Sequence, residues 1–283
     1  MIRFGTCSWK YDSWIGLVYS DSKSKNYLRE YSSKFNTVEI DQWFWSLFPP
    51  KKAILPDKKI VEEYQRSVPD DFLFTIKVPN SITLTHFYKS GTDEELNPNP
   101  FFLSPELFNK FLASLSPLKN KIECLIFQFE YLNKQKMKSL SELQIKFKEF
   151  FQKIGQKIPP IGVEIRNPNY LNEKYFNFLE ELKIVPVLLE GYYLPPVIET
   201  YDKFKKYIKN IAVLRLHGPD RKGIERIAND YWNQIYINRD KEIFSIVKLI
   251  KELQSNEVDL FVNVNNHFEG SAPLTIEKIK KLL

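Results

Sequence analysis

Short apolar runs alternate along the chain with longer segments in which apolar residues recur at helical spacing. The runs are rich in β-branched and aromatic residues, which is typical of buried strands. We predict strands at 2–7, 36–41, 72–78, 122–129, 161–166, 184–189, 211–217 and 258–264. We predict helices at Tyr27–Lys34, Lys58–Ser67, Ser104–Ser114, Lys136–Lys153, Glu173–Leu182, Lys241–Leu253 and Thr275–Leu283. Most of the eight strands are therefore followed by a helix.

This alternation predicts an α/β protein with a parallel TIM (β/α)8 barrel, in which an outer ring of helices covers every strand. The 283 residues suit one such barrel of about 250 residues with longer connections after the third and seventh strands. No linker-like or repeated segment divides the chain, so we expect residues 1–283 to form a single domain. A doubly wound open sheet is the main alternative.

Polar residues interrupt six of the predicted strands, always at one parity and near the carboxyl end. In the second strand Glu39 and Asp41 alternate with Val38 and Ile40. Since side chains alternate between the two faces of a strand, the polar parity is expected to face the barrel axis. The same rule brings these side chains to the C-terminal mouth: Glu39, Asp41, Lys77, Gln128, Glu130, Glu164, Arg166, Arg215, His217, Asn263 and Asn265.

Such a polar layer has two interpretations. It is either a structural plug of paired charges, or one wall of a site for a polar ligand at the face where barrel enzymes build their active sites. Apolar layers are often as stable as buried ion pairs, so the recurrence on six strands favours the ligand. Lys and Arg suit a phosphate or carboxylate, and a facing carboxylate suits general acid/base chemistry.

The three histidines also fall near this face, because His86, His217 and His267 each follow or end a predicted strand. Together with the carboxylates they permit a divalent metal site, since imidazole and carboxylate suit Zn, Mn or Fe. The cations at the same rim oppose a metal ion, and no two histidines share a short spacing. Whether a metal or any other cofactor is bound stays open.

Aromatic residues cluster after the first two strands, where Trp9 and Trp43 are expected to line one wall of the mouth and stack on a sugar ring or nucleobase. Packing of these loops over the barrel is the alternative. Cys7 ends the first strand, and a small core residue is its default interpretation against a nucleophile. The further members of this cluster are Tyr11, Trp14, Phe44 and Trp45.

Composition narrows the function classes. The motifs GxGxxG, GxxxxGK, HExxH, CxxC and GxSxG are absent, which removes the simplest nucleotide-binding, zinc-protease, redox and serine-hydrolase interpretations. The net charge of +6 is spread over helix faces, so nucleic acid is permitted but not indicated. There is no membrane-length apolar run and no signal-like N-terminus, so we expect a cytoplasmic protein that does not bind membranes.

Several segments of the chain are similar to the YecE-like proteins, a domain of unknown function (number 72). The resemblance implies a TIM barrel with a polar pocket at its mouth and carries over no activity. Two loops, after the sixth and seventh strands, depart from the family pattern. The matching segments are GTCSWKYDSW at 5–14, FNTVEIDQWFWSLF at 35–48, FTIKVPNSITLTH at 74–86, LIFQFEYL at 125–132, VEIRNPNYL at 163–171, LRLHGPD at 214–220 and FVNVNNHFEGSAP at 261–273.

The residues together favour an enzyme, a hydrolase or isomerase, acting on an anionic, hydroxyl-rich ligand such as a sugar phosphate or nucleic-acid fragment. A metal-assisted phosphodiesterase or isomerase and a non-catalytic nucleic-acid-binding protein are the alternatives, and the oligomeric state is open. We predict catalytic roles for Glu39, Lys77, Glu164 and His217. Ligand-binding roles are predicted for Asp41, His86, Gln128, Arg166, Arg215, Asn263, Asn266, His267, Trp9 and Trp43.

Overall fold

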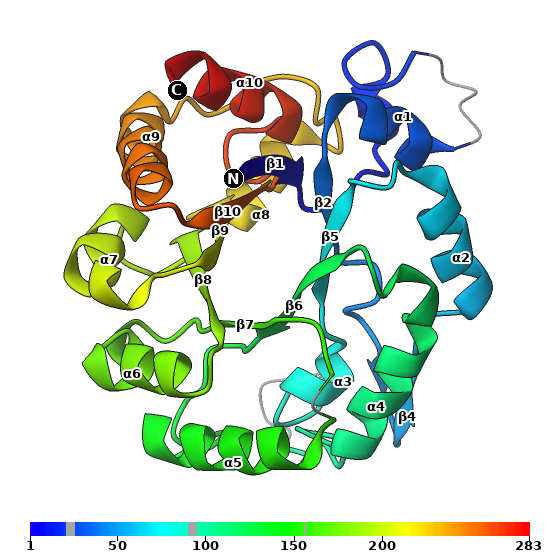
Figure 1. The fold of residues 1–283 in the computed structure, drawn as a ribbon, viewed down its shortest axis with the longest axis vertical. Helices are drawn as coiled ribbons and strands as arrows, with labels where there is room; N and C mark the ends of the chain where they lie inside the picture. Colours follow the sequence, from blue (N-terminus) through cyan, green and yellow to red (C-terminus); the bar gives the residue numbers. More distant parts are fainter. Residues whose placement is uncertain (21–25, 90–94, 156) are drawn as a thin grey trace.

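The computed structural model describes residues 1–20, 26–89, 95–155 and 157–283. Eight parallel strands form a nearly closed barrel, seen end-on in Figure 1. The order around the barrel is β1-β10-β9-β8-β7-β6-β5-β2. The predicted TIM barrel is thereby confirmed. The strands are β1 (Ile2–Thr6), β2 (Thr37–Ile40), β5 (Leu73–Lys77), β6 (Ile122–Gln128), β7 (Ile161–Glu164), β8 (Val185–Gly191), β9 (Ile211–Gly218) and β10 (Asp259–Val264).

The ring closes between β1 and β2, at the start of the chain. Cys7 and Glu39 form an isolated parallel bridge there, and the amide of Ser8 donates to the carbonyl of Glu39 at 3.1 Å. A β-carbon on Gly5 would collide with the backbone of Thr37, so the two strands approach closely only because this residue is glycine. On its other side β1 pairs with β10, the last strand.

Helices surround the strands as an outer ring (Figure 1). Those predicted from the sequence are present as α1 (Tyr27–Lys34), α2 (Lys58–Ser67), α4 (Pro105–Ser114), α5 (Leu140–Lys153), α6 (Glu173–Glu181), α9 (Asp240–Ser255) and α10 (Ala272–Leu282). Side chains of Asn26, Asp57, Ser104, Ser139 and Asn172 cap the first five of these by accepting backbone N–H bonds. Ser139 explains why α5 begins four residues later than its amphipathic pattern.

Further elements lie in segments where the pattern was too short to predict them. They are α3 (Asn80–Thr83), α7 (Val197–Phe204), α8 (Arg221–Ala228), the antiparallel pair β3 (Leu47–Phe48) and β4 (Lys52–Ala53), and 3₁₀ turns at Asp12–Trp14, Ser116–Leu118, Pro168–Tyr170 and Lys205–Tyr207. The helix α8 has only eight residues and contains Gly223, which weakens a sequence-based prediction. Its start is set by Asp220, whose side chain accepts from the amide of Gly223.

Two apolar cores hold the fold. The larger lies between strands and helices, and the smaller fills the barrel below its polar layer. The smaller core consists of Cys124, Ile126, Val185, Val187, Val213 and Phe261. Ile126, Val213 and Phe261 each precede a polar inward residue by two positions. Since residues two apart on a strand face the same side, the barrel interior changes from apolar to polar toward the carboxyl ends of the strands.

Both cysteines, Cys7 and Cys124, are buried and free. Within the described ranges, no helix is both long enough and apolar enough to cross a lipid bilayer.

Candidate functional site

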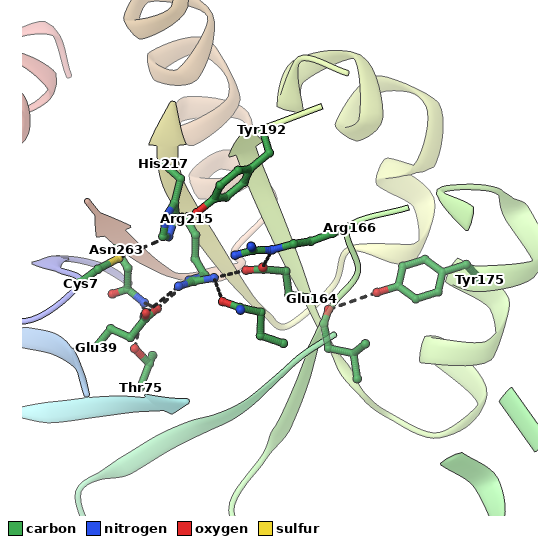
Figure 2. Close-up of polar contacts among 12 residues, drawn as sticks. Cys7, Glu39, Thr75, Glu164, Arg166, Tyr175, Tyr192, Arg215, His217 and Asn263 are labelled. Atoms are coloured by element: carbon green, nitrogen blue, oxygen red, sulfur yellow. Dashed lines mark hydrogen bonds and ion pairs between the residues drawn. The ribbon is translucent and has the colours of Figure 1, made fainter. Parts of the chain in front are cut away.

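Arg215 lies at the centre of the polar layer, where three strands present acceptors to it (Figure 2). Its Nε and Nη2 each donate to one oxygen of Glu39 at 2.7 Å. Its Nη1 donates to Glu164 and, at 3.2 Å, to Oε1 of Gln128. Arg215 is 1% exposed and both carboxylates are 0% exposed, so these charges are held by one another and not by solvent.

Neighbouring groups use the remaining capacity of the two carboxylates. Asn263 donates through Nδ2 to Glu39 at 3.3 Å and to Oγ1 of Thr75 at 2.8 Å. Arg166 donates through Nε to Glu164 at 3.0 Å. Burial by itself would raise the pKa of Glu164, but the charges of Arg215 and Arg166 outweigh it and hold the pKa below its usual value. Glu164 is therefore ionised at neutral pH.

A cavity of about 340 Å³ opens above this layer, at the carboxyl ends of the strands. Its walls come from strand ends and from the loops that follow them. The residues that line it are Tyr11, Glu39, Asp41, Phe44, Trp45, Lys77, Leu84, Tyr88, Gln128, Glu130, Arg166, Tyr192, Arg215, His217, Arg221, Glu225, Asp230, Trp232, Asn265, Asn266 and His267.

Lys77, the last residue of β5, brings an ammonium group to the cavity without a counter-ion among the described residues. Its Nζ lies 3.7 Å from the centre of the Phe44 ring, and no other side chain in the described ranges forms an ion pair or hydrogen bond with it. Burial, together with the positive charge of Arg215, lowers the pKa of Lys77 to about 8. A fraction of this amine is thus neutral at physiological pH.

Asp41 follows β2 at the same cavity. Burial, aided by the charge of Glu39, raises the pKa of Asp41 to about 6, although Lys77 and Arg215 oppose this shift. Within the part of the chain that the structure describes, its carboxylate has no ion-pair or hydrogen-bond partner from another residue. Asp41 is therefore poised to exchange a proton near neutral pH, which the paired Glu164 is not.

Arg166 has spare donors on the cavity side. Only its Nε is bonded to Glu164, and its guanidinium carbon lies 4.2 Å from the centre of the Tyr192 ring. Its two terminal nitrogens have no partner among the residues described. A planar guanidinium with two free nitrogens is the geometry that binds a carboxylate or phosphate through two hydrogen bonds.

The imidazole ring of His217 lies in the same region as Arg166, but it is neutral. Its Nε2 lies 3.7 Å from Sγ of Cys7 and its Nδ1 lies 3.3 Å from the hydroxyl of Tyr192. Burial, followed by the nearby cations Arg215, Arg166 and Lys77, places the pKa of His217 well below its usual value. Burial and the charge of Glu39 raise the pKa of the Cys7 thiol, so Cys7 is a protonated core residue.

The rim beside α8 carries a second polar group. His267 Nε2 lies 3.2 Å from Oε1 of Glu225, which Arg221 also contacts at 2.7 Å. Burial and Arg221 lower the pKa of His267 to about 4. Asn266 accepts from the amide of Ala272 at 2.9 Å, while its buried Nδ2 has no partner in the described residues. Asn266 thus has a buried, unpaired amide donor, although other parts of the residue line the cavity.

Four of the residues predicted to bind a ligand do not line the cavity. Trp9 is 1% exposed and packs edge-on against Tyr64, on which Trp43 also stacks. His86 lies outside the lining with Nδ1 2.9 Å from Oγ1 of Thr85. Asn263 lies below the cavity in the charged layer. Their neighbours in the loops or in the layer hold these side chains away from the cavity, which the alternation of residues could not reveal.

Other residues at the cavity were missed from the sequence, among them Tyr192 and Arg221. The pairing of β8 with β9 shifts register between Glu190 and Gly191, so the parity rule stops before Tyr192. A β-carbon on Gly191 would lie 2.7 Å from the amide nitrogen of Gly218, so glycine permits this bend. The remaining residues of this kind are Leu84, Tyr88, Glu225, Asp230 and Trp232.

The arrangement of side chains gives a metal ion no evident ligand set. Across the described segments, no three His, Cys, Asp or Glu side chains converge as metal ligands. The carboxylates of Glu39 and Glu164 point to Arg215 instead, and the rings of His217 and His267 contact Cys7, Tyr192 and Glu225.

Almost the whole chain is similar to known proteins. Residues 3–283 match the family described as "Protein of unknown function DUF72". The chain belongs to this family. A curated relative is UPF0759 protein YunF of Bacillus subtilis (strain 168), 24% identical over 300 residues that cover 100% of this chain and 95% of YunF. The YecE-like resemblance is thereby confirmed.

Solved DUF72 structures share the fold. A DUF72 family protein from Enterococcus faecalis V583 is 20% identical, with a TM-score of 0.69 over 100% of this chain and 96% of the other. Another from Thermotoga maritima MSB8 is also 20% identical, with a TM-score of 0.67 over 100% and 98% of the two chains. These similarities establish the barrel fold alone. A reaction has to be inferred from the residues of the cavity.

Proposed function

We propose that this DUF72 protein is an enzyme that binds a small anionic ligand in the cavity and transfers protons to and from it. One observation carries the proposal. Below the cavity the buried charges are paired, whereas Lys77, Asp41 and the terminal nitrogens of Arg166 reach the cavity with no partner among the described residues. Unpaired, partly buried charges are unfavourable unless a ligand supplies the missing ion-pair or hydrogen-bond partners.

The geometry changes which residues are given each role. Arg215 is fully engaged by Glu39, Gln128 and Glu164, so it supports the site and is not free to hold an anion. Glu39 and Glu164 are acceptors in the same network, so they are poor candidates for the general acid/base. We assign anion binding to Arg166 and proton transfer to Asp41, with Lys77 beside the reacting group.

The lining suits a ligand with hydroxyl groups, such as a sugar phosphate or hydroxy acid. Gln128, Asn265 and Asn266 supply amides, and Tyr192 and Tyr11 supply hydroxyls. Exposed aromatic residues at the rim, Trp45 and Tyr88, are in contact with each other with ring centroids 5.7 Å apart. They favour extending the test to a short oligonucleotide, whose bases stack on such side chains.

The test compares ligand binding to wild-type protein, Arg166→Gln and Lys110→Gln. Thermal stabilisation and calorimetry would use inorganic phosphate, pyruvate, lactate, a triose phosphate and a short oligonucleotide. We expect at least one anion to bind, with an affinity about tenfold or more lower in Arg166→Gln, since a charged hydrogen bond contributes about 1.5–3 kcal/mol. Lys110→Gln is the matched control, because Lys110 pairs with Glu106 on the outer face of α4.

Proton transfer is read separately, as exchange of a ligand C–H for deuterium in D2O. We expect Asp41→Asn to retain binding and to lose most of the exchange. If no anion binds, or if Arg166→Gln binds every anion like wild type, the anion site is wrong. Unchanged exchange in Asp41→Asn would remove Asp41 from its role.

A further inference from the structure

We propose that the amine of Lys77 condenses with a carbonyl group of the bound ligand to form a Schiff base, so that the substrate is an aldehyde or ketone that also carries a phosphate or carboxylate. This inference rests on the proposed function for the anionic group of the ligand. It adds a reactive carbonyl carbon beside Nζ, and hence covalent catalysis.

The position of Lys77 is the first support. It is the last residue of β5 and its side chain lines the cavity, two residues beyond Thr75 in the charged layer. Nζ lies over the face of Phe44 at 3.7 Å, with no hydrogen-bond acceptor from the described chain. A lysine placed only to balance charge would contact a carboxylate; this one contacts an aromatic ring and the open cavity.

The charged layer explains why neither of its two carboxylates pairs with Lys77. Glu39 is held at both oxygens by Arg215, and Glu164 is held by Arg215 and Arg166. The acidic groups of β2 and β7 are therefore paired with guanidinium ions, which cannot lose a proton. Lys77 is left as the one titratable cation beside these pairs, within the part of the barrel that is described.

Its protonation suits a nucleophile. The groups that act on Lys77 are Arg215, which disfavours the ammonium, and Glu39, Asp41 and Glu164, which favour it. Burial and Arg215 prevail, and the pKa falls from 10.5 to about 8. About one-tenth of the amine is then neutral at pH 7, roughly 300-fold more than for a free lysine side chain. Only the neutral amine has a lone pair to attack a carbonyl carbon.

The step balances without any oxidant or reductant. The lone pair of neutral Nζ forms the new C–N bond, the C=O π electrons move to oxygen, and the proton lost from nitrogen passes to that oxygen. Asp41 in its protonated form then gives a proton to the carbinolamine hydroxyl, which leaves as water. The nitrogen lone pair closes the C=N bond, leaving a protonated imine and the carboxylate of Asp41.

The other cavity groups fit this chemistry. Burial raises the pKa of Asp41 to about 6, so an acid for water loss and a base for a later proton transfer are both populated near neutrality. Arg166 and Tyr192 are placed to hold the anionic end, since both line the same space. A protonated imine would withdraw electrons from the neighbouring carbon, whose proton Asp41 then removes.

The test traps the imine with cyanoborohydride, whose hydride reduces C=N to a stable secondary amine. Wild-type protein is incubated with pyruvate, with dihydroxyacetone phosphate and with glyceraldehyde 3-phosphate. Lactate is the matched control because it has the charge of pyruvate and no carbonyl. We expect one adduct per chain for at least one carbonyl probe, mapped by peptide mass spectrometry to Lys77 with at least tenfold preference over Lys110.

Two further readouts keep the result independent of whether a variant folds. In wild type the trapping rate at Lys77 should be greatest between about pH 6 and pH 8 and fall on either side, because the condensation needs the neutral amine of Lys77 and the protonated carboxyl of Asp41. Lys77→Arg keeps the charge and should bind the anions while forming no adduct.

Adducts spread over surface lysines, or none at Lys77 with any carbonyl probe, would overturn the Schiff base. If phosphate or lactate still binds in an Arg166-dependent way in that case, the proposed function survives by itself. If no anion binds either, both proposals fail.

Discussion

Arg215 has acceptors from β2, β6 and β7 around one guanidinium, and this arrangement decides which neighbouring side chains are free to react. Its contacts hold Glu39 and Glu164 as oriented acceptors. The groups that are free to react therefore lie further toward the carboxyl ends of the strands, at Asp41 and Lys77. From the sequence, a structural plug of paired charges and a site for a polar ligand are alternatives. In the proposed function both are present, with the layer of paired charges below and the ligand site above it.

Removing the guanidinium should strongly destabilise the protein. Arg215→Met leaves the carboxylates of Glu39 and Glu164 buried without their partner, and we expect the free energy of unfolding to fall by about 3–5 kcal/mol. Urea denaturation at pH 7 measures this. The triple variant with Glu39→Gln and Glu164→Gln removes the orphaned charges and should recover part of the loss. A loss below about 1 kcal/mol in Arg215→Met would contradict the buried network.

Asp41 should make stability depend on pH. Its pKa is raised from 3.8 to about 6 in the folded state, so the folded protein binds the proton more tightly than the unfolded chain. Its stabilising contribution is complete below pH 3.8 and is lost as the pH rises through about 6. Relative to wild type, Asp41→Asn should therefore become more stable over that range, by on the order of 2 kcal/mol, and stay so above it.

Parallel urea titrations of the two proteins between about pH 4 and pH 7.5 provide the measurement. A difference in unfolding free energy that does not change with pH would show that Asp41 titrates normally and has no raised pKa to use in catalysis.

At the scale of elements, the strands were predictable and the loops were not. Alternation of polar and apolar residues locates β2, β5, β6, β7, β9 and β10 and the direction of their side chains, since period two holds along a regular strand. It fails where a strand bends, as at Gly191, so Tyr192 was missed. The sequence left two positions open for Trp9 and Trp43, because an aromatic loop residue has the same sequence signature whether it lines a cavity or packs on a neighbour, as both do on Tyr64.

The seam between β1 and β2 should be intolerant of a side chain at position 5. A methyl group in Gly5→Ala would meet the backbone of Thr37, which cannot move as a flexible side chain can. We expect a destabilisation at or above the upper end of the about 1–3 kcal/mol typical of overpacking. Gly155→Ala is the matched control, because nothing in the described residues lies within 4 Å of the place its methyl group would take. Equal unfolding midpoints for the two variants would mean that the seam is looser than described.

At the scale of the whole molecule, the barrel follows from counting strands and helices, whereas the pairing within its interior does not. Eight strand–helix units leave few ways to bury every strand, so the count alone favours a closed ring. Which carboxylate faces Arg215 depends on how the strands are staggered, and that stagger is set by contacts far apart in the chain. The sequence therefore predicted the convergence of Glu39, Glu164 and Arg215, but it could not show that these two carboxylates are already engaged by the guanidinium.

The closure of the ring also has a consequence for biosynthesis. Arg215 follows Glu39 by 176 residues and Glu164 by 51, and β1 finds its second neighbour only in β10. A growing chain on the ribosome thus carries two unmatched carboxylates in its future interior and an open strand edge until almost all of it has emerged. Nascent chains halted before β9 should remain sensitive to proteases and be bound by chaperones, whereas the finished chain closes in a late, concerted step.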